Sequence, residues 1–394
     1  MKRVIVFVLV LFLGTVPILN AAPKKIVVKP LQLLTTVGTP GEVSGVVVSG
    51  KSLVVYGTQG LKAYARAIDS TGVELWNLSL DQSPASIATA AAVDSAGDIW
   101  IAGATPLAIG LVPEHPNPIN PDNAVTPPTT FVGDLQAITI WKISAAGALL
   151  FSNTLPTSYA VFPTAIALDK VGVSIVGIMA SEKVSAGFIT NTDLTGVFSK
   201  LLQIGALATT ADAVVRHSDG STTVAGSSAE TIAAKKVAGI SDGILVKVSK
   251  SLKITSVVRS SIAKGERIWN SASTSLLLGG EAIAAGKTEA AVTKFSTSFV
   301  PKWSYRFAAI GPAITLGSTQ LFFISTAALP QLVWSPKRPR PLLITFDAKG
   351  IITDADSGPV GQREVLGALF SKEFGVLVLT SSEESVSIFT RIPR

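Results

Sequence analysis

Few residues in this chain have the types and the spacing that catalysis requires. Its 394 residues include two histidines, His115 and His217, and no cysteine. Without cysteine there is no disulfide, no thiol nucleophile and no thiolate ligand for a metal. The sequence also lacks a G-x-S-x-G segment, which would place a serine nucleophile on a sharp turn between a strand and a helix. We therefore predict no catalytic residue.

A proline-rich segment within residues 106–136 contains the first of these histidines. Glu114 and His115 are adjacent there, and Asp122 follows nearby. One histidine among scattered carboxylates lacks the spacing of a metal-ligand set, so we predict no metal site and no cofactor. Proline makes the segment semi-rigid and poor in backbone donors. It is either a contact arm, with Glu114 and His115 as candidate binding residues, or a surface loop without a role.

A second candidate segment combines an indole with three cations. Trp334 is followed by Lys337, Arg338 and Arg340 in a stretch interrupted by prolines. The arginine fork matches carboxylate, sulfate or phosphate, and a tryptophan face stacks on cations or sugar rings. This chemistry predicts contact with an anionic glycan, to which Lys235 and Lys236 in another loop would add positive charge. A solvated basic loop that only stiffens the surface is the alternative.

The remaining polar and aromatic residues of interest fit structural roles. His217 lies in His217-Ser218-Asp219-Gly220, a sequence typical of a tight turn. The acid pairs Glu383-Glu384 and Asp354 with Asp356 lie in turn-like segments, where we expect solvated side chains. Five tryptophans fall on expected strands, and we expect most of them to pack between neighbouring sheets: Trp76, Trp100, Trp141, Trp269 and Trp303.

The element that recurs around these residues is a β-hairpin. In residues 90–105 an apolar run meets Asp94-Ser95-Ala96-Gly97-Asp98, and a second apolar run follows at once, which is typical of a hairpin. After an insertion, residues 138–143 and 148–151 flank a second turn. The unit is therefore four short strands.

This unit repeats along the chain. The expected turns of the outer hairpins fall at Gly72, Gly147, Gly196, Ser251, Ser298 and Gly350. Most steps between these turns are about 50 residues, as in a propeller blade. Three more strands are expected between residues 365 and 389, and the strand Leu31–Thr35 would supply their fourth. We predict an all-β propeller of about seven four-stranded blades, with the last blade closed by an N-terminal strand.

Two segments resemble known propeller repeats. Residues 92–105, AVDSAGDIWIAGAT, resemble the V-D-S-x-G-N-x-Y-V-x-G-x-T hairpin of bacterial SBBP-type seven-bladed propeller repeats. Residues 67–76, AIDSTGVELW, are similar to the A-x-D-x-x-T-G-x-x-x-W docking motif of quinoprotein propellers, but are one residue short. The first resemblance is weaker at 164–177 and 213–226 and faint elsewhere. It implies an exported scaffold, and both motifs describe packing between blades rather than chemistry.

The composition agrees with a buried, β-rich chain that is exported. Charged residues make up 15% of the chain, against about 25% in typical soluble domains. The mean hydropathy is +0.49, yet no apolar run after residue 20 approaches the roughly 20 residues of a spanning helix. Residues 1–21 have the basic head, apolar middle and small-residue end of a secretory signal. We expect cleavage after Ala21 and a single domain over residues 22–394. An uncleaved membrane anchor is the alternative.

Charge and loop placement indicate the kind of partner. Loss of Lys2 and Arg3 lowers the formal charge from +7 to +5, which favours weak attraction to anionic envelope polymers. The alternative is that the high isoelectric point only keeps the protein in solution. No basic stripe interleaved with aromatic residues indicates nucleic acid. The insertions 106–136, 227–242 and 327–341 all join second to third strands, so we expect them on one face, where loops on a rigid scaffold bind partners.

These observations favour a secreted or cell-envelope binding module, expected to be monomeric, for an envelope protein or an anionic polysaccharide. The alternative is a propeller enzyme, a lyase, glycosidase or cofactor-dependent oxidoreductase, with its site at the central channel. Ionisable side chains that converge at the channel mouth would favour the enzyme. A purely structural spacer is the third possibility.

Overall fold

The computed structural model describes residues 25–81, 85–107 and 135–391. Within these ranges every regular element is a β-strand, so no helix is available there to cross a membrane. The expected all-β class is confirmed. The expected signal at residues 1–21 lies outside the described residues.

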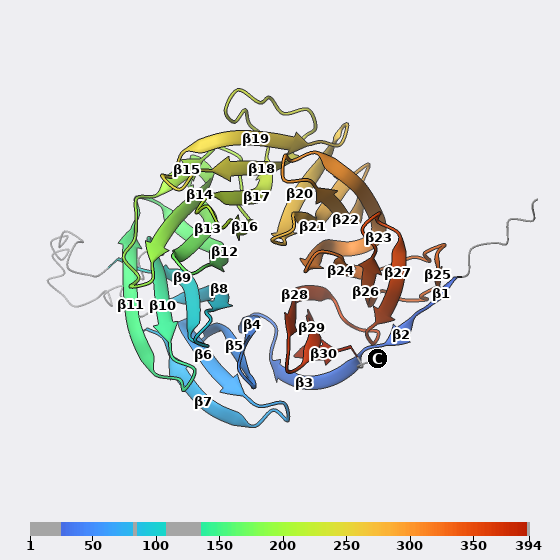
Figure 1. The fold of residues 1–394 in the computed structure, drawn as a ribbon, viewed down its shortest axis with the longest axis horizontal. Helices are drawn as coiled ribbons and strands as arrows, with labels where there is room; N and C mark the ends of the chain where they lie inside the picture. Colours follow the sequence, from blue (N-terminus) through green and yellow to red (C-terminus); the bar gives the residue numbers. More distant parts are fainter. Residues whose placement is uncertain (1–24, 82–84, 108–134, 392–394) are drawn as a thin grey trace, which may run out of the picture.

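Five of the sheets that the described residues form have four antiparallel strands, in an arrangement like that of a propeller (Figure 1). Short apolar strands separated by tight turns account for this pattern, because one such sheet cannot bury both of its faces alone. The five sheets are β4 (Val43–Ser49), β5 (Ser52–Gln59), β6 (Lys62–Ile68) and β7 (Glu74–Ser79); β8 (Ile87–Val93), β9 (Ile99–Thr105), β10 (Ala137–Ile143) and β11 (Leu149–Pro156); β12 (Ala160–Leu168), β13 (Gly172–Ser181), β14 (Val184–Asp193) and β15 (Leu202–Ile204); β16 (Ala213–Arg216), β17 (Thr222–Ser228), β18 (Asp242–Val248) and β19 (Ile254–Ser260); and β28 (Glu364–Ser371), β29 (Gly375–Ser381), β30 (Val386–Thr390) and β3 (Gln32–Gly38).

A further sheet of eight strands consists of two such units joined through one long strand, β23 (Pro301–Leu316). The first half of β23 pairs with β22 and the second half with β24, and the register breaks between Ile310 and Ile314. We call the two parts the β20–β23 unit and the β23–β27 unit. Their other strands are β20 (Gly265–Ala272), β21 (Leu277–Ala284), β22 (Lys287–Phe295), β24 (Gln320–Ser325), β26 (Arg340–Phe346), β27 (Ile352–Ser357) and β2 (Lys29–Pro30).

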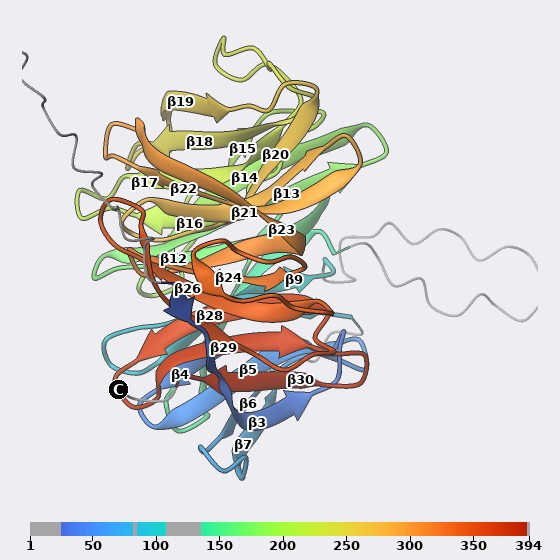
Figure 2. The same ribbon diagram turned by 90° about the vertical axis from the view of Figure 1, so that its right-hand side faces the viewer.

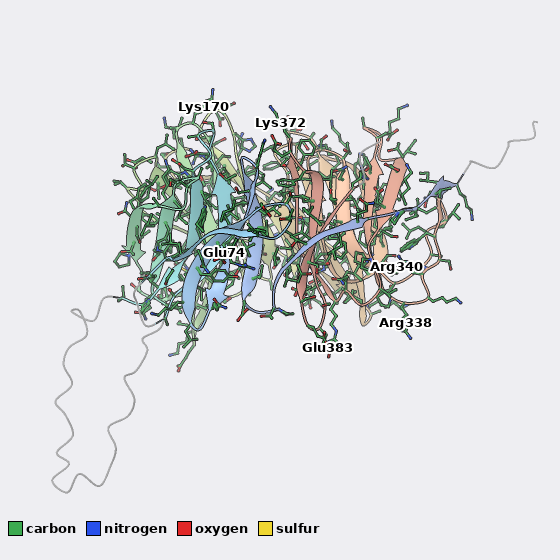
Figure 3. All side chains as sticks on the ribbon, turned by 90° about the horizontal axis from the view of Figure 1, so that it is seen from below. Glu74, Lys170, Arg338, Arg340, Lys372 and Glu383 are labelled. Atoms are coloured by element: carbon green, nitrogen blue, oxygen red, sulfur yellow. The ribbon has the colours of Figure 1, made fainter. Side chains whose placement is uncertain are left out.

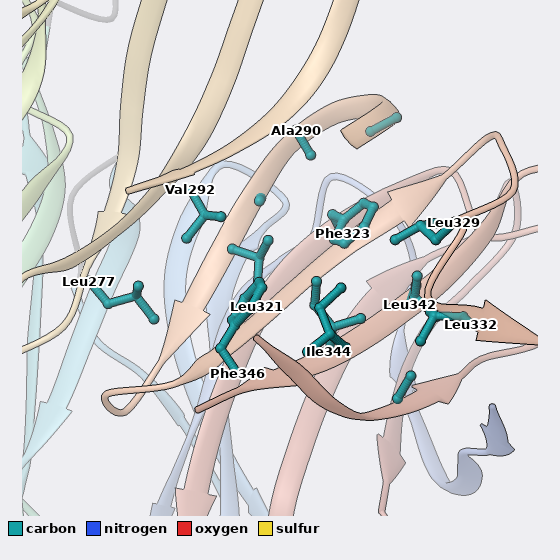
Figure 4. Packing of buried hydrophobic residues seen from close by; sticks show 14 residues of the cluster. Leu277, Ala290, Val292, Leu321, Phe323, Leu329, Leu332, Leu342, Ile344 and Phe346 are labelled. Carbon is teal, nitrogen blue, oxygen red and sulfur yellow. The ribbon is translucent and has the colours of Figure 1, made fainter. Parts of the chain in front are cut away.

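In each of the five four-stranded sheets one edge strand lies nearest the centre and the other lies nearest the rim, as β8 and β11 illustrate (Figure 1). Seen from the side, the sheets stand next to one another (Figure 2). The apolar core lies between neighbouring sheets. Figure 4 shows one such cluster, in which Leu277 and Val292 of the β20–β23 unit pack near Phe323 and Ile344 of the β23–β27 unit.

The N-terminal segment fastens two sheets of the chain's C-terminal part. β3 pairs with β30 in antiparallel register, with Leu33 opposite Phe389 and Gly38 opposite Val386. The expected pairing of an N-terminal strand with the last three strands is therefore present. Before β3, β2 pairs with β27, and β1 (Ile26–Val27) pairs with β25 (Leu332–Val333), both in parallel.

Aromatic side chains on outer strands pack against turn glycines of the next sheet or unit. A Cβ atom at Gly147 would lie 2.5 Å from the Trp76 ring, and one at Gly350 would lie 2.8 Å from the Trp303 ring. Both tryptophans are partly buried, whereas Trp100, Trp141 and Trp269 are fully buried. The expectation that most of these tryptophans pack between sheets is confirmed.

Two local expectations were wrong. The repeat predicts an outer strand directly after the turn at Gly196, but residues 196–198 form only a bridge between Phe198 and Thr192, and the outer strand of that sheet is β15, several residues later. Asp354 and Asp356 are not solvated turn residues. They lie on β27, where alternation turns both toward Arg391: the Arg391 guanidinium lies 3.6 Å from Asp354 Oδ2, and its Nε donates to Asp356 Oδ2 at 2.6 Å.

Candidate functional site

The segment 327–341, which joins β24 to β26, is anchored by its apolar residues. Leu329 and Leu332 are buried in the cluster between the β20–β23 and β23–β27 units. Within the segment β25 also pairs with β1 of the N-terminal segment. Buried leucines and a backbone ladder together hold the segment in place, so the cations beside it project from a fixed base.

Trp334 and Arg340 are fixed to each other and to the scaffold. The Trp334 Nε1 donates a hydrogen bond to Ser325 Oγ at 3.4 Å, and the Arg340 Cζ lies 5.5 Å from the centre of the indole ring. The Arg340 Nε and Nη2 both donate to the Gly358 carbonyl, at 3.1 and 2.8 Å. The protein itself therefore uses part of the indole face and two of the arginine donors that were expected to bind a ligand.

Lys337 and Arg338 remain exposed. Neither forms an ion pair with any residue in the described ranges. Figure 3 shows Arg338 on the same face of the molecule as Glu383, and on the opposite face from Lys170 and Lys372. Lys337 and Arg338 are therefore the cations of this segment that a partner can reach.

The segment 227–242 is held by a different polar network. The Glu230 carboxylate accepts hydrogen bonds from three successive backbone N–H groups, at residues 206–208, and from the Thr209 hydroxyl. Burial acts to raise the pKa of Glu230, but these hydrogen bonds outweigh it and lower the pKa. Arg259 donates to the carbonyls of Ser228 and Lys235. These hydrogen bonds hold the backbone of the segment 227–242 in place.

Lys235 and Lys236 follow a tight turn at Ala233 and Ala234, whose φ angles are +46° and +62°. Both lysine side chains are exposed. The turn lies beyond β17 and β18, whereas Lys337 and Arg338 lie beside β25, and the β20–β23 unit separates the two places (Figure 1). The structure therefore does not bring the two basic segments together. Glu114 and His115 lie outside the described residues.

The strands nearest the centre carry few ionisable side chains. In the described part of the chain these are Arg216, Glu266, Arg267 and Glu364. Arg216 pairs with Asp169 at 3.1 Å, and Arg267 packs over the Trp269 ring with 7% of its surface exposed. The residues described also contain no group of three or more His, Asp or Glu that could hold a metal. The inner strands thus supply few groups for catalysis.

His217 lies in the turn between β16 and β17, as expected. The backbone N–H of His217 donates to the Ser221 carbonyl at 2.9 Å. The Nε2 atom of its ring lies 2.7 Å from Thr223 Oγ1. Burial and the charge of Lys247 lower the pKa of His217, against the opposite effect of Asp219. Sequence reasoning took His217 as a turn residue only and overlooked the lysines around it, although a lysine recurs in the third strand of several repeats.

Comparisons with known proteins do not identify a function for this chain. No family model and no curated protein matches this chain. A solved structure of a protein of unknown function from Bacteroides caccae is similar over 84% of this chain and 99% of that chain, with 12% sequence identity and a TM-score of 0.37. The function must therefore be argued from this chain's own residues.

Proposed function

We propose that this chain is an exported β-propeller of about seven blades that binds an anionic polysaccharide of the cell envelope through the segment 327–341. Five four-stranded sheets, the two units of the eight-stranded sheet and the pairing of β3 with β30 support the blade count. The signal-like residues 1–21 support export. The resemblance of residues 92–105 to SBBP-type repeats supports a scaffold of this class.

One observation supports the binding role most directly. Lys337 and Arg338 are exposed and without an ion pair among the described residues, on a loop whose neighbouring Trp334 and Arg340 are fixed. Cations held on a rigid base lose little conformational freedom when they bind an anionic polymer. An array of sulfates or carboxylates along a polysaccharide provides the repeated negative charge that such a surface attracts.

The test measures retention of the mature protein on columns of dextran sulfate and polygalacturonate, with neutral dextran as the uncharged reference. We expect the parent protein to be retained on an anionic column and to elute with salt. The double variant K337A/R338A should elute at clearly lower salt, because two reachable charges are lost.

A matched control removes the same charge elsewhere. Lys183 and Lys264 are exposed lysines in other loops, and K183A/K264A should elute close to the parent. Equal elution of the two double variants would show that net charge alone drives retention and would overturn the proposed site. Failure of the parent to bind either polysaccharide would remove the proposed ligand class.

A further inference from the structure

A cavity of about 490 Å³ lies between the β16–β19 sheet and the β20–β23 unit. One wall consists of the turn at residues 217–221 with Thr223 and Lys247. The other consists of the turn at residues 274–276, Lys294 of β22 and the outer turn that leads to Lys302. We call this cavity the inter-sheet wedge. Its volume is in the range of pockets that hold small molecules.

The inter-sheet wedge holds more positive than negative charge. Lys247, Lys294 and Lys302 line it, and none of them forms an ion pair within the described ranges. Asp219 is the acid in its lining, and its Oδ1 already accepts hydrogen bonds from the N–H and hydroxyl of Ser221. One carboxylate therefore stands against three ammonium groups.

Lys294 is the most confined of the three lysines. Its Nζ donates to the carbonyl and hydroxyl oxygens of Ser275, at 2.5 and 2.8 Å, both of which are neutral acceptors. Burial lowers the pKa of Lys294, and the nearby charge of Lys302 lowers it further. An anion in the wedge would offset both effects, because it attracts the two ammonium groups that now repel each other.

The repeat supplies an internal comparison for these lysines. Lys142, Lys247 and Lys294 each stand directly before the register shift in the third strand of their sheet. In the β8–β11 sheet Lys142 is fully compensated: its Nζ lies 3.3 Å from Asp94 and 3.0 Å from Asp98, and 4.9 Å from the centre of the Trp100 ring. That lysine is part of the sheet's own structure.

In the β16–β19 sheet the equivalent lysine, Lys247, is present, but neither of the two aspartates has an acidic counterpart. Asp94 and His217 occupy the same position in their turns, because the backbone N–H of each donates to the backbone carbonyl of the residue four positions later. By the same alignment Ser221 stands where the other turn has Asp98. In the β20–β23 unit the residue that begins the corresponding turn is Ser273, which is also uncharged. Lys247 and Lys294 thus keep their places without the carboxylates that neutralise Lys142.

We propose that the inter-sheet wedge binds a small ligand through a phosphate or sulfate ester. Lysine ammonium groups act as point charges toward such anions, and the hydroxyls of Thr223, Thr274 and Thr297 line the same cavity as further donors. The wedge is built from turns that join first to second and third to fourth strands. Lys170 and Lys372 of such turns lie on the face opposite Arg338 (Figure 3), so this site does not depend on the proposed polysaccharide contact.

The test is isothermal titration calorimetry of the mature protein with glucose 6-phosphate, glucose 6-sulfate and glucose, at constant ionic strength. We expect binding of at least one ester and none of glucose; the arm that binds identifies the ester. The double variant K247Q/K294Q should bind that ester about tenfold more weakly or worse, because two charged hydrogen-bond donors are lost. The matched variant K253Q/K264Q, which changes two exposed lysines outside the wedge, should bind as the parent does.

A second variant separates loss of the site from loss of the fold. H217D/S221D places carboxylates where the β8–β11 sheet has Asp94 and Asp98, so Lys247 gains ion-pair partners of its own. We expect this variant to lose ester binding while its melting temperature is equal to or above that of the parent. Unchanged binding in both wedge variants would overturn the proposal, as would the absence of binding to either ester up to about 10 mM, a weak affinity for any specific site.

Discussion

Asp212 is the described carboxylate whose ionisation is most strongly disfavoured by its surroundings. It lies directly before β16, and its Oδ2 accepts one hydrogen bond, from Thr210 Oγ1 at 2.5 Å. Burial raises the pKa of Asp212 to about 6, and the Thr210 hydrogen bond offsets only part of this effect. Asp219, in contrast, is held by the N–H and hydroxyl of Ser221, and these bonds lower its pKa.

The sign of the stability effect follows from the direction of the Asp212 shift. The folded state holds the proton more tightly than the unfolded chain, whose aspartates titrate near the ordinary value of 3.8. The free energy of unfolding therefore falls as the pH rises from about 4 to about 6, and the loss is complete above that range.

We predict that D212N is more stable than the parent at pH 7.5, by about 3 kcal/mol for a shift of about two units. The advantage should shrink as the pH falls and be small near pH 4, where the carboxyl is protonated in the folded state and partly protonated in the unfolded chain. Urea unfolding at pH 4, 5, 6 and 7.5 measures this. As a control of opposite sign, D219N should be less stable than the parent at pH 7.5. A D212N protein that is no more stable than the parent at that pH would contradict the role of burial.

At the scale of the element, contacts between neighbouring sheets depend on an aromatic side chain and a turn glycine. Gly147 has a φ of +87° and lies against the Trp76 ring, and the Trp76 Nε1 reaches the Ala145 carbonyl at 3.4 Å. The turn thus requires glycine twice, once for its backbone angle and once for the close approach of the indole.

We predict that G147A lowers the free energy of unfolding by about 3 kcal/mol, from backbone strain and from displacement of Trp76. Gly41 separates the two causes, because its φ is +86° but a Cβ atom there meets nothing within 4 Å. G41A should therefore cost only the strain, about 1 kcal/mol. Equal losses in chemical denaturation of the two variants would show that the contact with Trp76 contributes nothing.

At the scale of the whole molecule, the two ends of the described chain are joined to the rest by non-covalent contacts. β3 covers the free edge of β30 and buries Val37 in the cluster that also contains Leu377 and Ile388. Arg391, close to the other end of the described chain, pairs with Asp354 and Asp356 of β27. A strand edge left open would be a template for association with other chains.

We predict that a chain beginning at residue 39 is less stable and self-associates, since β30 then lacks its partner. A chain beginning at residue 31 removes β1 and β2 but keeps β3, and it should remain monomeric. Size-exclusion chromatography and thermal melting compare the two. A synthetic peptide of residues 25–38, added to the shorter chain, should restore its melting temperature at least in part. A monomeric short chain with the parent's melting temperature would rule out this role for β3.

Most of the fold could be read from local patterns. Asp94 and Gly97 predicted a hairpin because a turn is specified by the residues within it, and the structure places the turn there with the Gly97 N–H donating to the Asp94 carbonyl. Alternation of apolar residues predicted the strands in the same way, and the leftover strand near residue 32 indicated a partner at the far end of the chain. The outer strand of the β12–β15 sheet was expected too early, because residues 196–198 have a strand-like sequence but form only a bridge to Thr192.

The sequence by itself determined the all-β class, the repeated hairpins and the surplus of basic side chains, because composition, alternation and turn chemistry act over a few residues. Tertiary structure alone decided which of those side chains are compensated. Arg340 is bound by the Gly358 carbonyl, Arg391 gathers two acids of β27, and Lys142 has the carboxylates that Lys247 lacks. Each of these pairings joins residues that are far apart in the sequence. They depend on the register of strands and the distance between sheets, which no local pattern specifies.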